Sequence, residues 1–284
     1  MSLARTFGVI GISLFTLDNP YLRELADAAL AEGRRLGYEV QVVGAGNDCD
    51  RQMRQVEAFV SNGVSAVALA PVDALRIGRA IRAANAARIP VFTVDTACSD
   101  PGAKVVAHVA TDNYGGGKQI AHAVIAALGE KGGTVAVVNN PLLESCQERV
   151  RGFKTVLAAH NAKGLAPVQV IVEETGGTVR DGGRTAAERI MAMEKPPDAI
   201  FALNDPAALG VWEILGRLPP ARRPLLFAFD ASEAGRRAVR SGAIRATAVQ
   251  YPDMVGEEIV RVIVRHLRGE PVPAETLVPT SLYR

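Results

Sequence analysis

The sequence predicts an α/β fold made of two doubly wound parallel-sheet lobes. Short apolar runs alternate with amphipathic segments of helical period along the whole chain of 284 residues. The second half repeats the rhythm of the first without obvious sequence identity, and no long linker separates the halves. A chain of this length is sufficient for two domains of about 140 residues each.

The first strand, loop and helix organise the rest of the chain. The apolar run at residues 7–12 suits a strand that is buried on both faces, and a loop follows at 13–18. Asn19 is a good N-cap residue and Pro20 suits the first helical position, so a helix is expected from Pro20 to Leu36. Gly37 then ends the helix.

The remaining elements follow the same alternation of strand and helix. In the first half, strands are expected at 40–43, 66–69, 91–94 and 105–109, and helices at 50–62 and 74–87. In the second half, strands are expected at 134–138, 168–172, 199–203, 225–229, 246–249 and 276–278. Helices there are expected at 114–128, 144–160, 184–193, 206–215, 232–240 and 253–267. The chain is expected to cross between the lobes near 110–111 and again near 250–251, with a ligand cleft between the lobes and a hinge motion.

Composition excludes several classes of function. The 32 basic and 30 acidic residues nearly balance and no basic block stands out, so no nucleic-acid partner is expected. No apolar run reaches the roughly 18 residues of a membrane span, and no signal peptide precedes the first strand. The three cysteines and four histidines show no metal-ligand spacing, so neither metal nor cofactor is expected. A disulfide between Cys49 and Cys98 stays open, although three free thiols are preferred.

Polar and aromatic side chains gather just after the predicted strands. Parallel α/β sheets bind ligands beyond the carboxyl ends of their strands, so these side chains mark a binding edge. Carboxylates and amides bind hydroxyl groups, arginine offers a fixed fork of donors, and aromatic faces cover sugar rings. The set suits a polyhydroxylated neutral ligand. Its members are Phe15, Asn19, Tyr21, Asp95, Thr96, Arg149, Asn204, Asp230 and Gln250.

Other roles are weighed for some of these positions. Asp112 and Asp205 are expected to be helix N-caps rather than ligand contacts. Arg149 has the alternative of pairing with a surface carboxylate such as Glu148. The run Gly115 to Gly117 resembles a phosphate loop, but it lies where a helix opens, so close helix packing or the lobe crossing is favoured.

An enzyme is disfavoured. No Ser-His-Asp or Cys-His arrangement, GxSxG elbow or Walker A run is present. Asp95 and Asp230 provide the two carboxyl groups of a glycosidase, but they are expected on separate lobes.

Seven stretches in this order and spacing resemble the periplasmic sugar-binding proteins of bacterial ABC transporters, specifically the ribose-binding-protein-like group with the type I fold. The resemblance covers about residues 6–283. The stretches are TLDNPY (16–21), IPVFTVD (89–95), HVATDNYGGGKQIA (108–121), ERVRGF (148–153), AIFALNDPAALG (199–210), LFAFDAS (226–232) and ATAVQYPDMVG (246–256).

The resemblance implies two lobes joined by a three-strand hinge around an enclosed sugar. The N-terminal lobe would comprise 1–110 and 251–278, and the C-terminal lobe 111–250 and 279–284. Motif by motif, Asn19, Tyr21, Asp95, Arg149, Asn204, Asp230 and Gln250 fall on ligand-contact positions. The protein is then expected to be a monomer that delivers a sugar or polyol to a membrane permease. A periplasmic location follows from the resemblance, with the native signal peptide absent from this sequence.

Four positions depart from the ribose-binding pattern. Leu22 and Thr178 stand where aromatic residues are usual, Thr96 replaces an arginine, and Phe15 replaces a small serine. Losing a charged hydrogen bond from a hydroxyl network costs roughly 2–5 kcal/mol. The expected ligand is therefore another monosaccharide, a deoxy sugar or a sugar alcohol rather than ribose.

Two related functions remain open. A sensing domain of a sugar-responsive transcriptional repressor would share this fold but would need a DNA-binding segment before Phe7. A receptor that also feeds a sensor kinase would look the same in sequence.

Overall fold

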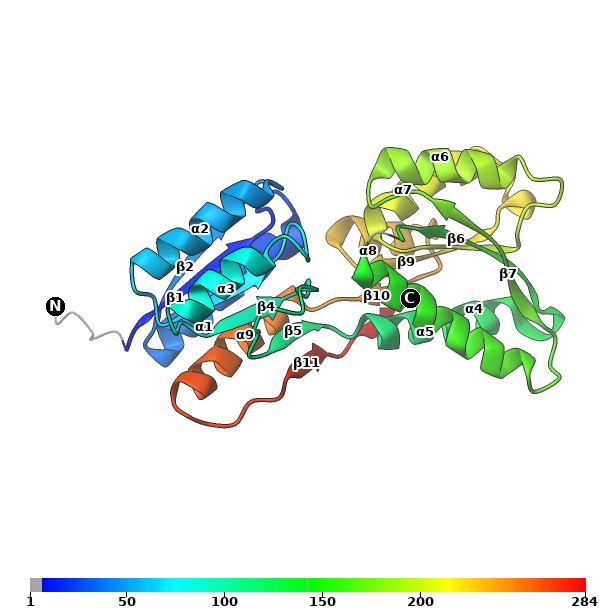
Figure 1. Cartoon of the computed structure of the whole chain (residues 1–284). Coiled ribbons are helices and arrows are strands. Elements are labelled where there is room, and N and C mark those ends of the chain that lie inside the picture. The colour runs from blue at the N-terminus through cyan, green and yellow to red at the C-terminus, as the bar shows by residue number, and fades with distance from the viewer. Residues whose placement is uncertain (1–6, 142) are drawn as a thin grey trace. The chain divides into compact units, whose positions relative to one another are not determined.

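The computed structural model describes residues 7–141 and 143–284. The chain divides into two compact units (Figure 1). Unit 1 extends to Thr111 and resumes at Tyr251–Val278, while unit 2 comprises Asp112–Gln250 and Pro279–Arg284. The backbone therefore passes between the units three times, after Thr111, Gln250 and Val278.

Unit 1 is built on a six-stranded sheet in the order β11-β5-β4-β3-β1-β2, in which every pairing is parallel. Its strands are β1 (Val9–Leu14), β2 (Glu39–Gly44), β3 (Ala66–Ala70), β4 (Val91–Val94), β5 (His108–Thr111) and β11 (Glu275–Val278). Its helices are α1 (Pro20–Leu36), α2 (Cys49–Ser61), α3 (Gly78–Ala86) and α9 (Pro252–Leu267). Helices α1 and α9 cover one face of the sheet, and α2 and α3 cover the other.

Unit 2 repeats the plan with a sheet in the order β12-β10-β9-β8-β6-β7. Its strands are β6 (Gly133–Asn139), β7 (Val168–Thr175), β8 (Ala199–Ala202), β9 (Leu225–Asp230), β10 (Ala246–Val249) and β12 (Ser281–Tyr283). Its helices are α4 (Asn113–Leu128), α5 (Glu144–Asn161), α6 (Arg180–Met191), α7 (Asp205–Leu215) and α8 (Glu233–Arg240), and 3₁₀ turns lie at Gly129–Lys131 and Pro220–Arg222. Strand β12 pairs antiparallel with β10, whereas the other pairings are parallel.

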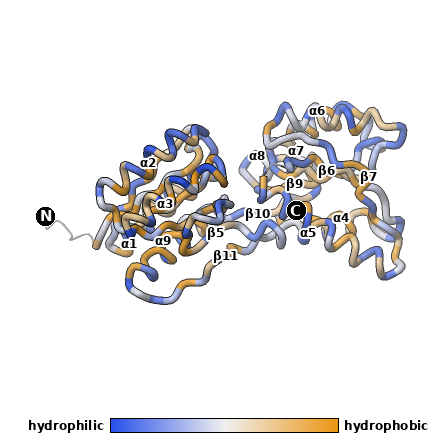
Figure 2. Tube along the Cα trace, viewed as in Figure 1, coloured by the Kyte–Doolittle hydropathy of each residue, from blue (hydrophilic) through white to orange (hydrophobic). Residues whose placement is uncertain are grey.

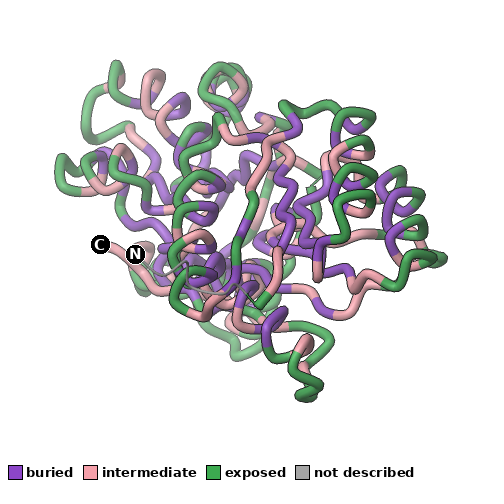
Figure 3. Tube along the Cα trace, turned by 90° about the vertical axis from the view of Figure 1, so that its left-hand side faces the viewer, coloured by how far each residue is buried: buried purple, intermediate pink, exposed green. Residues whose placement is uncertain are grey.

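Each sheet is buried on both faces, which explains its continuous apolar strands. In unit 2, α4 and α5 pack on one face, and α6 and α7 on the other. Helix α2 alternates hydrophobic and hydrophilic residues in Figure 2, as a helix with one buried face should. Figure 3 shows the buried residues along the strands and inner helix faces, and the exposed residues on outer turns. The predicted α/β class with two doubly wound sheets is confirmed.

Element boundaries follow local signals where these are strong. Helix α1 has the predicted bounds because the Asn19 side chain accepts a hydrogen bond from the Tyr21 backbone N–H, and Gly37 adopts a left-handed conformation with φ of 82°. The first strand, in contrast, begins two residues later than predicted and extends through Ser13. The Ser13 hydroxyl donates to Gln55 Oε1 of α2, so a polar residue is satisfied inside the strand.

Other boundaries also differ from the prediction: helix α6 begins at Arg180 rather than at residue 184, and strand β5 is His108–Thr111 rather than 105–109. Helix α3 begins at Gly78 rather than at residue 74, because the Asp73 carboxylate accepts from the backbone N–H groups of Leu75 and Arg76 and holds a turn there. Strand β7 continues to Thr175 rather than ending at residue 172, because its pairing with β6 extends to Asn139 opposite Thr175. Strand β12 was not predicted.

Candidate functional site

Four neighbouring strands of unit 2 bring candidate residues to one edge of its sheet. Gln250 follows β10, Asp230 ends β9, Asn204 follows β8, and Arg149 lies in α5, the helix after β6. These strands are adjacent in the order β10-β9-β8-β6, and their carboxyl ends point the same way. The residues therefore lie at the edge where doubly wound sheets bind ligands.

Arg149 is held by a network of fixed partners. Its Nε donates to Asn113 Oδ1 at 2.9 Å, and its Nη1 donates to the Leu203 carbonyl at 2.5 Å. The guanidinium carbon lies 3.8 Å from the centre of the Phe229 ring, and only 6% of the residue is exposed. Within the described residues Nη2 has no hydrogen-bond partner, so this nitrogen can donate to a ligand. The alternative pairing with Glu148 does not occur, because Glu148 pairs with Arg151.

Asp230 joins Arg149 to Gln250. Its Oδ1 accepts from Gln250 Nε2 at 2.6 Å and lies 3.5 Å from Arg149 Nη1. Burial raises the pKa of Asp230, while the Arg149 charge and the Gln250 hydrogen bond oppose that rise. The three side chains form one bonded group in which the positive and negative charges balance.

Asn204, and not Asp205, is the N-cap of helix α7. Asn204 is the N-cap of α7, because its Oδ1 accepts from the Ala207 backbone N–H at 2.9 Å and its Nδ2 donates to the Thr178 carbonyl at 3.0 Å. Asp205 is not the cap that was predicted. It is 1% exposed and accepts hydrogen bonds from Ser232 and Thr247. Burial and the negative charge of Asp230 raise the pKa of Asp205 to about 7. The other predicted cap, Asp112, does cap its helix.

Unit 1 presents its candidates at the carboxyl ends of β1 and β4, with β3 between these strands. Phe15 is partly buried against the core of the unit. Asn19 is exposed at the start of α1, and within the described residues its amide nitrogen has no hydrogen-bond partner. Tyr21 lies two residues further along and shares a hydrogen bond of 3.2 Å between its hydroxyl and that of Thr111. An amide and two aromatic surfaces thus lie beside the first strand.

Asp95 and Thr96 follow β4 directly. Asp95 has a positive φ of 63°, which is uncommon for a residue with a side chain. The Thr96 hydroxyl lies 3.5 Å from Asp95 Oδ2. Backbone strain of this kind costs about 1–3 kcal/mol and tends to occur at functional sites.

The other positions that depart from the ribose-binding pattern differ in whether their side chains could reach a ligand. Leu22 is fully buried in the core of unit 1 and offers no surface to a ligand. Thr178 contributes its backbone carbonyl to Asn204. Phe15 is therefore the departure that adds an aromatic surface at this edge.

Two residues that position Arg149 were not among the predicted site residues. Asn113, the first residue of α4, accepts from the arginine Nε, and Phe229 lies under its guanidinium plane. Asn113 follows a predicted strand, so the strand-end pattern could have identified it. Phe229 reads as an ordinary core residue in the sequence, and only the packing of β9 against α5 reveals its contact.

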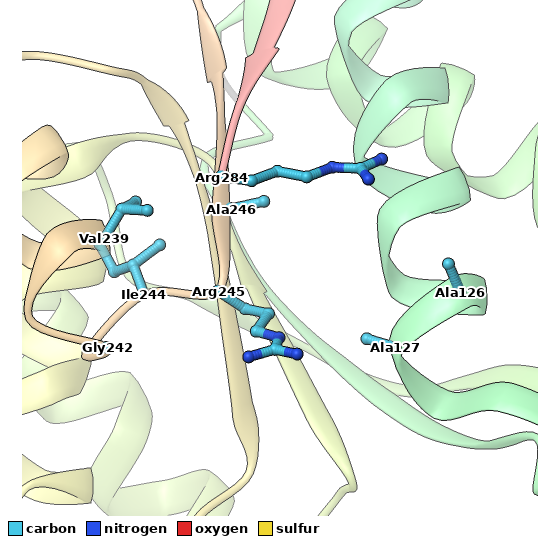
Figure 4. Close-up of a pocket in the computed structure, with 8 residues that line it drawn as sticks. All are labelled: Ala126, Ala127, Val239, Gly242, Ile244, Arg245, Ala246 and Arg284. Atoms are coloured by element: carbon cyan, nitrogen blue, oxygen red, sulfur yellow. The ribbon is translucent and has the colours of Figure 1, made fainter.

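A separate pocket lies at the opposite end of the same sheet (Figure 4). Its volume is about 350 Å³, and the side chains of Arg245 and Arg284 extend into it toward Ala126 and Ala127 of α4. Arg245 precedes β10, whereas Gln250 follows it. The pocket is therefore distinct from the candidate site at the carboxyl ends.

The cysteines are free, as preferred from the sequence: Cys49 and Cys146 are buried and Cys98 is partly exposed. In residues 7–141 and 143–284, no cluster of histidine, cysteine or carboxylate side chains has the composition of a metal site. No helix in this part of the chain is long and apolar enough to cross a membrane.

Two α/β units connected by three chain crossings, with arginine, carboxylate and amide side chains at the carboxyl edges of their sheets, are typical of two-lobed receptors for small solutes. Comparison with known proteins supports that class. Residues 10–271 match the family model described as periplasmic binding protein domain, and the chain belongs to this family.

Curated relatives extend over nearly the full length. The chain is 29% identical to the ribose import binding protein of Haemophilus influenzae, covering 99% of this chain and 92% of that protein. It is 30% identical to the ribose import binding protein of Bacillus subtilis, covering 96% and 86% of the two chains. The solved structure of the Caulobacter myo-inositol binding protein with bound myo-inositol is 26% identical, with a TM-score of 0.83 and coverage of 97% and 92%. These relatives are named as binding proteins rather than as enzymes.

Proposed function

We propose that this protein is the solute-binding receptor of an ABC-type sugar importer. Its ligand is a neutral monosaccharide or polyol, which it captures and delivers to a membrane permease. The names of the relatives support the class of ligand and the importer. Their family supports a periplasmic location for the native protein.

The observation that carries the proposal is the bonded group of Arg149, Asp230 and Gln250. Arg149 Nη2 offers two N–H donors, and Asp230 offers acceptor oxygens beside them. Gln250 uses its nitrogen on Asp230, so its oxygen remains as an acceptor. A donor and an acceptor side by side match a hydroxyl group, which both donates and accepts. The balanced charges favour a neutral ligand over an anion.

The ligand is proposed to contact both units. Asn19, Tyr21, Asp95, Thr96 and Phe15 would contribute from unit 1, and Arg149, Asp230, Gln250 and Asn204 from unit 2. Asn204 already uses its Oδ1 and one Nδ2 hydrogen within unit 2, so it would contribute through its second Nδ2 hydrogen and the remaining lone pair of Oδ1. Because contacts from both units form only in the closed arrangement, binding would shift the population toward closure. The protein would act as a monomer, with no nucleic acid as partner.

Ribose is not proposed as the preferred ligand. Thr96 supplies a hydroxyl where the ribose-binding pattern has an arginine, and Phe15 adds an aromatic surface where the pattern has a serine. A ligand with fewer hydroxyls, or with an apolar ring face, fits these changes better. A deoxy sugar or a cyclic or linear sugar alcohol meets that description.

A thermal-shift panel tests the proposal. The panel contains D-ribose, 2-deoxy-D-ribose, L-fucose, xylitol and myo-inositol, with ribose 5-phosphate as the charged control. The protein is first unfolded in urea, dialysed and refolded so that no sugar carried through purification occupies the site. A ligand at a thousand times its Kd should raise Tm by roughly 8–16 °C.

We expect one neutral compound other than ribose to give the largest shift and the phosphate to give none. Tightest binding of D-ribose would refute the proposed specificity. A panel without any shift after refolding would refute the sugar receptor itself.

A further inference from the structure

Asp205 is a buried carboxylate that the proposed ligand contacts do not use. It is the first residue of α7 and accepts hydrogen bonds from three donors. Its Oδ2 accepts from the Ser232 backbone N–H and from the Ser232 hydroxyl, both at 2.7 Å. Its Oδ1 accepts from the Thr247 hydroxyl at 3.3 Å. The N-cap role at this helix belongs to Asn204, so capping does not explain Asp205.

The partners of Asp205 hold a strained turn. Asp230 and Ala231 both have positive φ, at 107° and 53°, conformations that cost energy in residues with side chains. The Ala231 N–H donates to Thr247 Oγ1 at 3.2 Å, and Arg236 Nε donates to the Ala231 carbonyl at 2.8 Å. Ser232, the next residue, is bound twice by Asp205. The turn therefore keeps its conformation because hydrogen bonds from its surroundings fix two successive residues, Ala231 and Ser232.

We propose that Asp205 is a positioning residue for ligand binding: its carboxylate locks the turn at residues 230–232 and so aims the Asp230 carboxylate at a ligand hydroxyl. The Asp205 backbone N–H also points to Asp230 Oδ2, at 3.4 Å. This inference rests on the proposed function for its effect on sugar affinity. Its effect on the turn itself does not depend on any ligand.

The ionisation of Asp205 gives the proposal a distinctive readout. All three of its partners are donors, so the ionised carboxylate satisfies them, whereas a protonated carboxyl would present a donor of its own. The charged groups around it are Asp230 on β9, Arg149 on α5 and Arg236 on α8. Burial and the charge of Asp230 raise the pKa of Asp205 to about 7. The hydrogen bonds from Ser232 and Thr247 lower this pKa, so it would rise further if they were lost while the carboxyl stayed buried. Acidification from pH 8 to pH 6 should therefore favour the opened turn over the locked turn and weaken sugar binding.

Three variants separate positioning from general stability. Asp205→Asn keeps the shape but removes the charge, and it imitates the protonated state. Gly235→Ala places a Cβ within 2.1 Å of Asp205 Oδ2 and displaces the carboxylate without changing the charge. The matched control is Asp198→Asn, whose carboxylate likewise accepts from a backbone N–H and a hydroxyl, those of Thr134. Asp198 precedes β8, so it lies at the opposite end of that strand.

Amide hydrogen exchange of the full chain without sugar is measured first. Asp205→Asn and Gly235→Ala should each accelerate exchange of the Ala231 and Ser232 amides by at least about tenfold, a change of about 1.4 kcal/mol in local opening. Asp198→Asn should match the parent protein. Unchanged exchange in both Asp205→Asn and Gly235→Ala would overturn the proposal, whether or not any sugar binds.

Calorimetric titration with D-ribose, xylitol and myo-inositol at pH 6, 7 and 8 follows. The parent protein should lose severalfold affinity on acidification, and Asp205→Asn should bind weakly with a smaller pH dependence. Gly235→Ala should bind weakly but keep the pH dependence. The same pH profile in Asp205→Asn as in the parent would overturn the coupling to binding. If none of the sugars binds while exchange accelerates as expected, the proposed function fails and the locked turn stands.

Discussion

At the scale of single residues, Arg149 combines two roles in one side chain. Its Nε and Nη1 are used for internal hydrogen bonds, and its second terminal nitrogen is the one proposed to donate to a ligand. The same guanidinium neutralises Asp230, which lies in a largely buried environment. Removing Arg149 therefore affects both binding and folding, because an unpaired buried carboxylate is costly.

Arg149→Ala should weaken sugar binding at least tenfold, about 1.4 kcal/mol. It should also lower the free energy of unfolding by about 3 kcal/mol, since Asp230 loses its charged partner. Calorimetric titration and urea unfolding followed by Trp212 fluorescence measure the two effects, because Trp212 lies in α7 of unit 2.

The control is Arg151→Ala, which removes an arginine from the same helix whose side chain is 63% exposed and pairs with Glu148. Its effect on stability should stay below about 1 kcal/mol. Normal sugar affinity in Arg149→Ala would show that this arginine does not contact the ligand.

At the scale of elements, α4 and α5 approach closely through glycines. A Cβ on Gly117 would lie 2.0 Å from the Arg149 carbonyl, and one on Gly152 would lie 2.0 Å from the Tyr114 carbonyl. These are backbone atoms of the facing helix, so no side chain can move aside. The expectation that this glycine run serves helix packing agrees with the contact, and the same packing positions the first turns of α5 that carry Arg149.

Gly117→Ala should therefore force α5 away from α4. We expect a loss of about 3 kcal/mol or more in unfolding free energy, the upper range for overpacking against atoms that cannot shift. Thermal and urea unfolding measure the loss. His122→Ala on the exposed side of α4 serves as control and should change stability by no more than about 0.5 kcal/mol. Unaltered stability in Gly117→Ala would contradict the close approach of the two helices.

At the scale of the whole molecule, unit 1 is completed by a segment that follows unit 2 in the chain. Helix α9 returns to pack against α1, and Arg261 of α9 donates to Glu32 of α1 at 2.7 Å. Glu32 is 4% exposed and is also bound by Arg35. The hydrogen bond from Arg35, and then that from Arg261, lower the pKa of Glu32 from 4.5 to about 2 despite its burial.

A lowered carboxyl pKa stabilises the fold above the unfolded value and loses that effect as the pH falls. The contribution of Glu32 should thus be complete above about pH 4.5 and disappear toward pH 2. Glu32→Gln should reduce the free energy of unfolding at neutral pH by about 2 kcal/mol and make the acid limb shallower. Urea unfolding by circular dichroism between pH 3 and pH 7 measures both.

Glu257→Gln is the control, because Glu257 pairs with the same Arg261 but is 41% exposed. An acid limb in Glu32→Gln as steep as that of the parent would exclude Glu32 as its source. Asp205 acts with the opposite sign in unit 2. Relative to the fully unfolded chain, its raised pKa favours the folded state at low pH, and this contribution is lost as the pH rises toward about 7.

Local signals allowed much of the fold to be predicted. Helix α1 was predicted to the residue because Asn19 and Gly37 mark its ends through their own backbone and side-chain preferences. Ser13 and β12 were missed for the opposite reason. The hydroxyl of Ser13 is satisfied by Gln55, 42 positions away, and β12 exists because β10 offers it a free edge.

The candidate site shows the same division. The strand-end pattern selected Arg149, Asp230 and Gln250 one at a time, and their contact across β9, β10 and α5 is visible only in the fold. Asn204 and Asp205 both have the chemistry of an N-cap, so local preference could not decide between them. The fold makes Asn204 the cap, because the Asp205 carboxylate accepts hydrogen bonds from the backbone N–H and the hydroxyl of Ser232 instead.

The sequence by itself determined the α/β class, the order of the elements up to β11 and the family. These properties depend on periodicity, caps and motif spacing, which act over a few residues. The tertiary structure alone decided which side chains contact one another. It places the Arg149 guanidinium over the Phe229 ring, Glu32 between Arg35 and Arg261, and the Asp205 carboxylate in a hydrogen bond with the Ser232 backbone N–H. Hydrogen bonds and buried charges depend on distances of a few ångströms between segments far apart in the chain, and no local preference encodes those distances.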